Sequence, residues 1–337
     1  MKIVWLTVST DLTGSGGDPG STVASVRYRV LIPAAGLSAR GHEARVIGYD
    51  RDSMDQARQA VADADVVIFR RNYEDPGCIE GLLAETAALG KKTVFDLSDD
   101  RLHGRVGPHL RRMVELAGSV TTTSDSLCRK IREEYGREAF AIGDPFEGPR
   151  GEPRWRPGTR LRALWFGHPV NLPSLEQCLP VLLHAARNKP MDLRIVTGRV
   201  DGLERQCKEF NARHRNVLSL RYAEWSGEET WRSLADADFV VIPYIAGHPR
   251  SMAKSPNRII ESLWAGRFVV AQPIPSYLEF SEWAWIGEDI GQGIGWMMDH
   301  PAVIESRILA AQRHIEDRYS AEHIAAEWET VCRRLLS

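Results

Sequence analysis

A chain of 337 residues, 43% hydrophobic and 26% charged, has the length and composition of two globular domains that each bury their own core. Its formal net charge of -2 excludes a general attraction to nucleic acid or to an anionic membrane. No apolar stretch approaches the roughly 18 residues of a transmembrane helix, and segment 1–9 lacks the cleavage site of a signal peptide. The five scattered cysteines without CxxC spacing are typical of a reducing compartment and of neither a disulfide framework nor a zinc site. We therefore expect a cytoplasmic protein, with peripheral membrane contact left open.

The first half of the chain alternates short apolar runs with helical patterns, which is typical of parallel α/β units. The pattern predicts strands at 3–8, 44–47, 66–70, 93–97, 119–123 and 139–142. It predicts helices at 26–41, 54–62, 79–89, 109–117 and 126–135. Six strands with intervening helices indicate a Rossmann-like domain over residues 1–146.

Residues 147–160 are rich in proline, glycine and arginine and have no period, so they are predicted to link two domains. A second α/β series follows, with strands at 161–166, 192–196, 217–222 and 239–243 and helices at 175–186, 203–213 and 228–236. We expect a second Rossmann-like domain over 161–300. The apolar stripes of 301–337 predict C-terminal helices that pack across both domains. Two such domains place a ligand between them, at the carboxyl ends of the strands.

The segment 254–279 combines a helix, a glycine stop, a short apolar strand and a proline turn. Ser255 is predicted to cap the helix and Pro256 to take its first position, where a missing N–H costs nothing. The apolar face of this helix carries Ile259, Ile260, Leu263 and Trp264. Gly266 ends the helix, and 268–271 has the composition of a buried parallel strand.

Three polar residues, Asn257, Arg258 and Glu261, lie in the first two turns of this helix. The positive end of the helix dipole and its free backbone N–H groups suit an anion such as a phosphate. The alternative is a helix–strand unit whose first turns only face water.

The loop 11–22, after the first strand, contains Gly16 and Gly17. Glycines let backbone N–H groups approach a phosphate or sugar closely, so this loop is either a phosphate or acceptor loop or a flexible lid. Arg27 and Arg29 on the next helix are candidates to contact an anionic acceptor, with a surface position as the alternative.

A carboxylate–histidine cluster follows the fourth strand, formed by Asp99, Asp100 and His103 together with Asp96. Such a cluster at a strand end suits a general base. Aspartates at this spacing also suit Mg²⁺, and a third interpretation is a group of helix caps and salt bridges.

Four segments together resemble the two-domain nucleotide-sugar glycosyltransferases of the GT-B fold, and most of all the group-1-like, retaining-type bacterial enzymes. The segments are LSARGHEARVI at 37–47, WFGH at 165–168, ADADFVVIP at 235–243 and the stretch 254–279. The resemblance spans the whole chain, and its most specific part lies within 235–280. It implies a donor-binding C-terminal domain and an acceptor-binding N-terminal domain.

By this resemblance, Glu261 accepts hydrogen bonds from the ribose hydroxyls of the donor. Lys254 and Arg258 neutralise the diphosphate as it leaves, and His168 is a second catalytic candidate beside the leaving group. The implied donor site also contains Gly167, Arg199, Trp225, Ser255 and Asn257. GT-B enzymes usually work without a bound metal, so the resemblance implies no metal and no cofactor besides the nucleotide-sugar co-substrate.

The expected function is transfer of a hexosyl group from a nucleoside-diphosphate sugar to a hydroxyl of a glycan, lipid-linked or protein acceptor, in bacterial surface glycan or glycoconjugate synthesis. Two features differ from the family pattern. Ala253 stands where related enzymes often have a second glutamate, and the loop 167–171 lacks their Arg–Lys pair. They support the alternative of a non-catalytic subunit that binds a sugar nucleotide or glycan. An epimerase or phosphorylase of the same fold is the other alternative.

Overall fold

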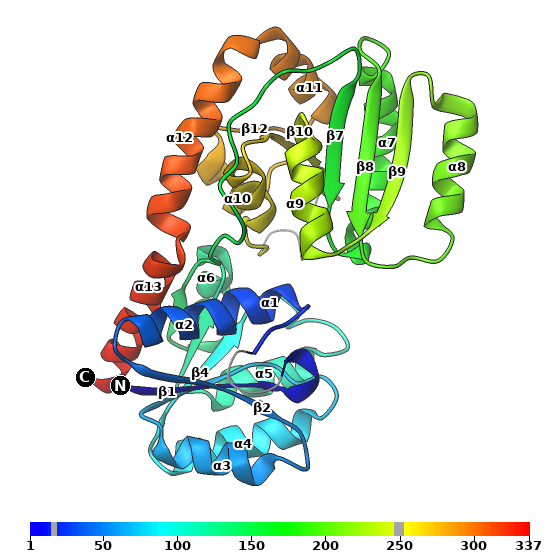
Figure 1. Cartoon of the computed structure of the whole chain (residues 1–337). Helices are drawn as coiled ribbons and strands as arrows, with labels where there is room; N and C mark the ends of the chain where they lie inside the picture. The colour runs from blue at the N-terminus through cyan, green and yellow to red at the C-terminus, as the bar shows by residue number, and fades with distance from the viewer. Residues whose placement is uncertain (15–18, 246–252) are drawn as a thin grey trace. The chain divides into compact units, whose positions relative to one another are not determined.

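The computed structural model describes residues 1–14, 19–245 and 253–337 and divides into two compact units. Unit 1 comprises Met1–Pro145, Ala253–Ser255 and Arg318–Ser337, and unit 2 comprises Phe146–Met252 and Pro256–Asp317. Each unit contains one parallel six-stranded sheet with helices on both faces (Figure 1). The predicted fold of two Rossmann-like domains is therefore confirmed.

The sheet of unit 1 has the strand order β2-β1-β3-β4-β5-β6. Its strands are β1 (Lys2–Val8), β2 (Glu43–Tyr49), β3 (Val66–Phe69), β4 (Lys92–Leu97), β5 (Ser119–Thr122) and β6 (Ala139–Ala141). Its helices are α1 (Ala24–Val26), the π-helix η2 (Arg27–Leu31), α2 (Ile32–Ala39), α3 (Met54–Asp63), α4 (Pro76–Ala88), α5 (Gly107–Leu116), α6 (Asp125–Tyr135) and α13 (Ala321–Leu336). The elements lie close to the predicted ranges because each strand and helix has its own local apolar period.

Successive residues of β1 serve two separate cores, as the period of two along a strand requires. Ile3 and Trp5 pack with α1, η2, α2 and α13, whereas Val4 and Leu6 pack with α3 to α6. Burial on both faces explains why these strands read as continuous apolar runs.

The sheet of unit 2 has the strand order β12-β11-β10-β7-β8-β9. Its strands are β7 (Leu161–Phe166), β8 (Met191–Thr197), β9 (Leu218–Glu224), β10 (Phe239–Ile242), β11 (Phe268–Ala271) and β12 (Trp285–Ile286). Its helices are α7 (Leu172–Ala185), α8 (Leu203–His214), α9 (Gly227–Asp236), α10 (Asn257–Trp264), α11 (Ile290–Asp299) and α12 (Pro301–Tyr319). The helix α9 packs against β7 and β8, and Figure 1 shows α7 behind the sheet. Within the described ranges, none of the helices combines the length and the apolar character that spanning a bilayer requires.

The helix α11 and the short strand β12 were not predicted. The sequence of α11 contains Gly291, Gly293 and Gly295, which weakens any helical signal. Tertiary packing explains the glycine at the centre, since a Cβ on Gly293 would come within 2.5 Å of Val270 and Trp285. Close approach of the helix to the sheet therefore outweighs poor propensity.

The start of α10 differs by one residue from the prediction. The carbonyl oxygen of Pro256 accepts hydrogen bonds from the N–H groups of Ile259 and Ile260 at 2.9 and 3.1 Å, so Pro256 is itself the N-cap. The predicted capping role of Ser255 is therefore wrong.

The end of α10 is a Schellman motif around Gly266, whose φ is +76°. The N–H of Arg267 donates to the carbonyl of Ser262, and the N–H of Gly266 donates to that of Leu263, both at 2.9 Å. A Cβ at Gly266 would also lie 2.1 Å from the carbonyl oxygen of Glu152. This position thus requires glycine for both its conformation and its surroundings.

We expect Gly266→Ala to lower the free energy of unfolding by about 2–5 kcal/mol, from left-handed strain plus the clash with backbone. Gly202→Ala is the matched control in the same unit, because Gly202 has a φ of +82° but a Cβ added there would have no atom closer than 4.0 Å. The control should lose only about 1–2 kcal/mol in urea unfolding. Equal losses in the two variants would contradict the clash.

Candidate functional site

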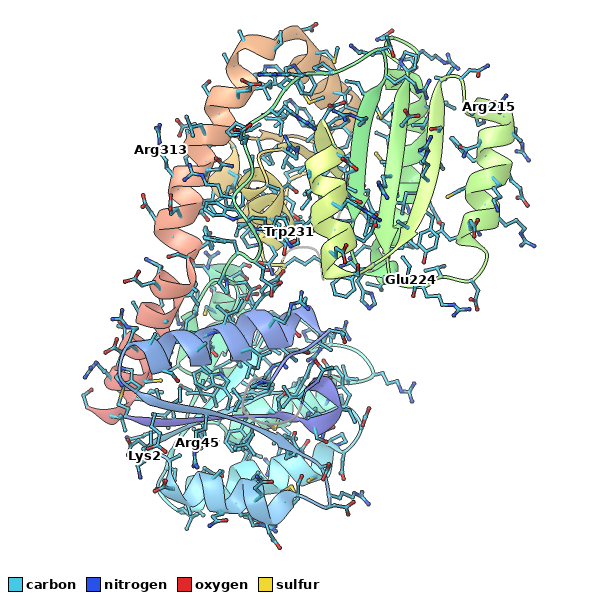
Figure 2. All side chains as sticks on the ribbon, in the orientation of Figure 1. Lys2, Arg45, Arg215, Glu224, Trp231 and Arg313 are labelled. Carbon is cyan, nitrogen blue, oxygen red and sulfur yellow. The ribbon has the colours of Figure 1, made fainter. Side chains whose placement is uncertain are left out.

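The strand order of unit 2 creates one point where neighbouring loops diverge. The chain runs outward through β7, β8 and β9, then returns to pair β10 with β7 and continues in the other direction. In an open parallel sheet, ligands bind outside the carboxyl ends of the strands at such a switch point. Gly167 follows β7 and Tyr244 follows β10, and Glu224, labelled in Figure 2, lies at the carboxyl end of β9.

Arg258, in the first turn of α10, lies at this switch point. Its Nη2 donates a hydrogen bond of 2.6 Å to the hydroxyl of Tyr244, and its guanidinium carbon lies 5.1 Å from the centre of that ring. The Tyr244 hydroxyl lies 2.8 Å from that of Tyr277. On the other side, a Cβ at Gly167 would be 3.5 Å from Arg258 Nη1. The guanidinium is thus held between the loops that leave β7 and β10.

The guanidinium of Arg258 donates a hydrogen bond to the neutral hydroxyl of Tyr244, and within the described residues no ion pair between Arg258 and a carboxylate is found. Burial lowers the pKa of Arg258, but Tyr244 and Tyr277 raise it by more, so the guanidinium stays protonated. Burial raises the pKa of Tyr277 well above its ordinary value, so its hydroxyl stays neutral. Arg258 therefore keeps its positive charge.

Several buried polar atoms at this edge have no hydrogen-bond partner within the described part of the chain. They are Arg258 Nη1, Thr197 Oγ1 at the end of β8 and Ser276 Oγ in the 3₁₀ helix η5 (Pro275–Phe280). Leaving a buried donor or acceptor unpaired costs about 1–3 kcal/mol. Such atoms indicate a place where a polar ligand completes the hydrogen bonding.

The remaining predicted residues of segment 254–279 divide between the two units. Glu261 lies three residues after Arg258, hence on the same side of α10, and Asn257 begins that helix; both are half-buried. Lys254 and Ser255 are half-buried and group with unit 1.

Ala253, where the resemblance expects a glutamate, is 6% exposed and packs in the apolar core of unit 1. Its carbonyl oxygen accepts a hydrogen bond of 3.5 Å from Ser124 Oγ. A glutamate at this position would bring a carboxylate into an apolar cluster.

Three other predicted donor-site residues follow the strands of unit 2. His168 is exposed, and its Nδ1 accepts a hydrogen bond from the N–H of Val170 at 3.2 Å. Arg199 is exposed and lies 3.8 Å from Asp201. The half-buried Trp225 donates its backbone N–H to Thr197 at 2.8 Å. All three lie in loops at the carboxyl ends of the strands.

The predicted carboxylate–histidine cluster of Asp99, Asp100 and His103 does not form one group, because its members contact different residues. Asp100 forms a 2.6 Å ion pair with Lys130, while the exposed His103 lies 3.6 Å from Glu134. Asp99 is exposed. Within the described ranges, no group of three or more His, Cys, Asp or Glu residues has the arrangement of a metal site.

Arg29 and Asp96 form a buried ion pair of 2.7 Å between Nη2 and Oδ1, and both side chains are fully buried. Arg29 also contacts Asp144 at 3.2 Å. The interpretation of Arg29 as a surface or acceptor-contacting residue is therefore wrong. A guanidinium that is buried away from water needs a negative charge beside it, which Asp96 and Asp144 supply to Arg29.

The predicted loop residues are only partly described. Gly16 and Gly17 lie outside the described residues. Arg27 is half-buried, donates from Nη1 to the carbonyl of Ser21 at 3.2 Å, and lies over the ring of Tyr28.

Comparison with known proteins gives structural matches only. No protein-family model matches the sequence, and no curated protein matches it. The structure of HepE from Anabaena in complex with UDP matches with a TM-score of 0.67 at 14% identity, over 99% of this chain and 100% of HepE. A glycosyltransferase from Rickettsia africae matches with a TM-score of 0.67 at 11% identity, over 100% of this chain and 98% of that protein. The chain has the GT-B fold.

A second HepE structure, in complex with UDP-glucose, matches with a TM-score of 0.65 at 15% identity, over 99% of this chain and 100% of HepE. At these identities the likeness establishes the fold, and the site rests on the chain's own residues.

Sequence reasoning missed Tyr244 as a partner of Arg258. The only local signal is a tyrosine directly after a buried strand and its proline. Its contact with Tyr277 joins positions 33 residues apart, which no periodicity predicts.

Proposed function

We propose that this GT-B chain is a glycosyltransferase that moves a sugar from a nucleoside-diphosphate sugar to an acceptor hydroxyl. The observation that carries the proposal is Arg258, a charged and incompletely hydrogen-bonded guanidinium at the switch point of unit 2. A planar guanidinium binds a phosphate through two parallel hydrogen bonds, which suits the diphosphate of such a donor.

The reaction breaks the bond between the anomeric carbon and the diphosphate oxygen, and the diphosphate leaves with the electron pair. The anomeric carbon then bonds to the acceptor oxygen, whose proton is released. Negative charge grows on the leaving oxygen, so a preorganised cation and the helix N–H groups beside it lower the barrier. Arg258 is proposed to supply this charge, with Asn257 beside it at the N-terminus of α10.

Other predicted residues complete the proposal. Lys254 is assigned to the diphosphate and Glu261 to the ribose hydroxyls. Asp99, Asp100, His103 and His168 remain candidates for accepting the acceptor proton. UDP and UDP-glucose in the HepE structures support a UDP-hexose as the donor to test first. A surface glycan or glycoconjugate as the product and a cytoplasmic location also belong to this proposal.

The role of Glu261 is tested by titrating UDP and 2′-deoxy-UDP into wild-type protein and Glu261→Gln. We expect the variant to lose about 10- to 100-fold in affinity for UDP, because hydrogen bonds to a charged group contribute about 1.5–3 kcal/mol. It should also lose most of the preference for UDP over the deoxy nucleotide. Glu204→Gln, on the exposed helix α8, is the control and should bind like wild type. An unchanged preference in Glu261→Gln would contradict the assignment.

The second candidate function, a non-catalytic sugar-nucleotide-binding subunit, is favoured by the buried Ala253 in place of a glutamate. Turnover separates the two functions. Release of UDP from UDP-sugars or GDP from GDP-sugars in the presence of acceptor extracts supports the enzyme. Tight binding without release supports the subunit.

A further inference from the structure

Unit 1 has a switch point of its own, between β1 and β3. The chain passes from β1 to β2 on one side and then to β3 on the other side, where the sheet continues to β4. Thr7 lies near the carboxyl end of β1, and Arg70 directly follows β3. The same rule that places a ligand in unit 2 therefore places one beside Arg70.

Arg70 is 2% exposed, yet its hydrogen bonds go to hydroxyls. Nη1 donates to Thr7 Oγ1 at 3.3 Å, and Nη2 donates to Ser25 Oγ at 2.9 Å. Among the described residues, its one ion pair is with Asp11 Oδ2, 3.9 Å from Nη1, which is beyond hydrogen-bond distance. Arg29, by contrast, has one carboxylate at 2.7 Å and a second at 3.2 Å.

The charge of Arg70 is thus incompletely compensated. Burial and, to a smaller extent, the neighbouring Arg71 together lower the pKa of Arg70 to about 10, because Asp96 and Asp11 oppose this change only in part. Asp96 already serves Arg29 with its carboxylate. A buried cation in this state gains from any oxyanion that reaches it.

Three side chains beside Arg70 are partly exposed. The side chain of Asp11 is 29% exposed, and Ser25 and Arg71 are half-buried. Asp11 belongs to the 3₁₀ turn η1 (Ser9–Asp11), outside the sheet. Asp11 is therefore the carboxylate that an incoming oxyanion would replace beside Arg70 Nη1.

We infer that Arg70, with Thr7 and Ser25, binds an oxyanion of the acceptor, a carboxylate or a phosphate, in place of Asp11. Because the site lies in unit 1 and the donor site in unit 2, naming it an acceptor site rests on the proposed function. The planar guanidinium takes two oxygens at once, and the two hydroxyls donate to the same group. The acceptor is accordingly an acidic sugar or a phosphate-bearing glycan or lipid.

The test titrates the full chain with inorganic phosphate, and separately with acetate, at constant ionic strength. Amide signals of Thr7, Ser25, Arg70 and Arg71 are followed by nuclear magnetic resonance. We expect saturable shifts in wild type, at least about threefold tighter binding in Asp11→Asn, where a repelling charge is gone, and at least about tenfold weaker binding in Arg70→Gln. Tighter binding of phosphate assigns a phosphate-bearing acceptor, and tighter binding of acetate assigns a carboxylate.

Asp52→Asn, at an exposed aspartate of the same unit, is the control for Asp11→Asn and should bind like wild type. If Arg70→Gln does not fold, the Asp11→Asn result decides alone, because that variant keeps the buried arginine. Absence of saturable shifts, or no tightening in Asp11→Asn, overturns the inference. UDP affinity is measured on the same samples and should not change in Asp11→Asn. If the wild-type protein does not bind UDP, the proposed function is overturned, whereas the phosphate titration still tests the site at Arg70.

Discussion

Replacing Arg258 by alanine should lower kcat/KM for the donor by about 100- to 1,000-fold. This is the usual effect of removing one preorganised group that stabilises charge in a transition state. Arg258 is expected to act in this way because its guanidinium is held by Tyr244 and keeps Nη1 free of a hydrogen-bond partner within the described residues. Arg258→Lys should recover only part of the loss, because an ammonium keeps the charge and loses the planar fork. Release of UDP from UDP-glucose is the measurement.

The control is Arg205→Ala, an exposed arginine on α8 of the same unit, 3.6 Å from Glu209. Its kcat/KM should stay within about twofold of wild type, as expected for an exposed pair. Thermal unfolding of both variants shows whether Arg258→Ala is folded at the assay temperature. A folded Arg258→Ala with nearly wild-type turnover would remove the basis of the donor site.

Asp96→Asn should cause the largest loss of stability, about 3–5 kcal/mol in the free energy of unfolding. Breaking a buried pair leaves the remaining charge poorly compensated, and here Arg29 would stay fully buried with Asp144, at 3.2 Å, as its remaining carboxylate partner. Asp96 also accepts a hydrogen bond of 2.8 Å from Thr121, which the amide weakens. Urea unfolding measures the change.

Asp63→Asn makes the same chemical change in an exposed pair. Lys2 and Asp63 are 2.8 Å apart, close to the 2.7 Å of Arg29 and Asp96, but both side chains are about half exposed. Water already screens this pair, so the loss of stability should be much smaller than that of Asp96→Asn. Similar losses in Asp63→Asn and Asp96→Asn would show that burial of the pair does not control its contribution.

The sequence by itself predicted the two sheets, most of their helices and the stretch that contains Arg258 and Glu261. This succeeded because a buried parallel strand and an amphipathic helix carry their own period within a few residues. The glycine that ends α10 was also predicted from the sequence, because the left-handed residue that ends a helix is usually glycine. Where the local signal was weak, as in the glycine-rich α11, prediction failed.

Only the tertiary structure decided which side chains meet. Strand order places Gly167 and Tyr244 on either side of Arg258, and it places Arg70 at the switch point of unit 1. The same long-range packing buried Arg29 against Asp96, although the two lie 67 residues apart in the sequence. Local periodicity reports which face of an element is apolar, whereas strand order depends on how whole elements pack. For this reason the sequence could predict that α10 binds an anion, whereas the fold was needed to identify the side chains that contact Arg258.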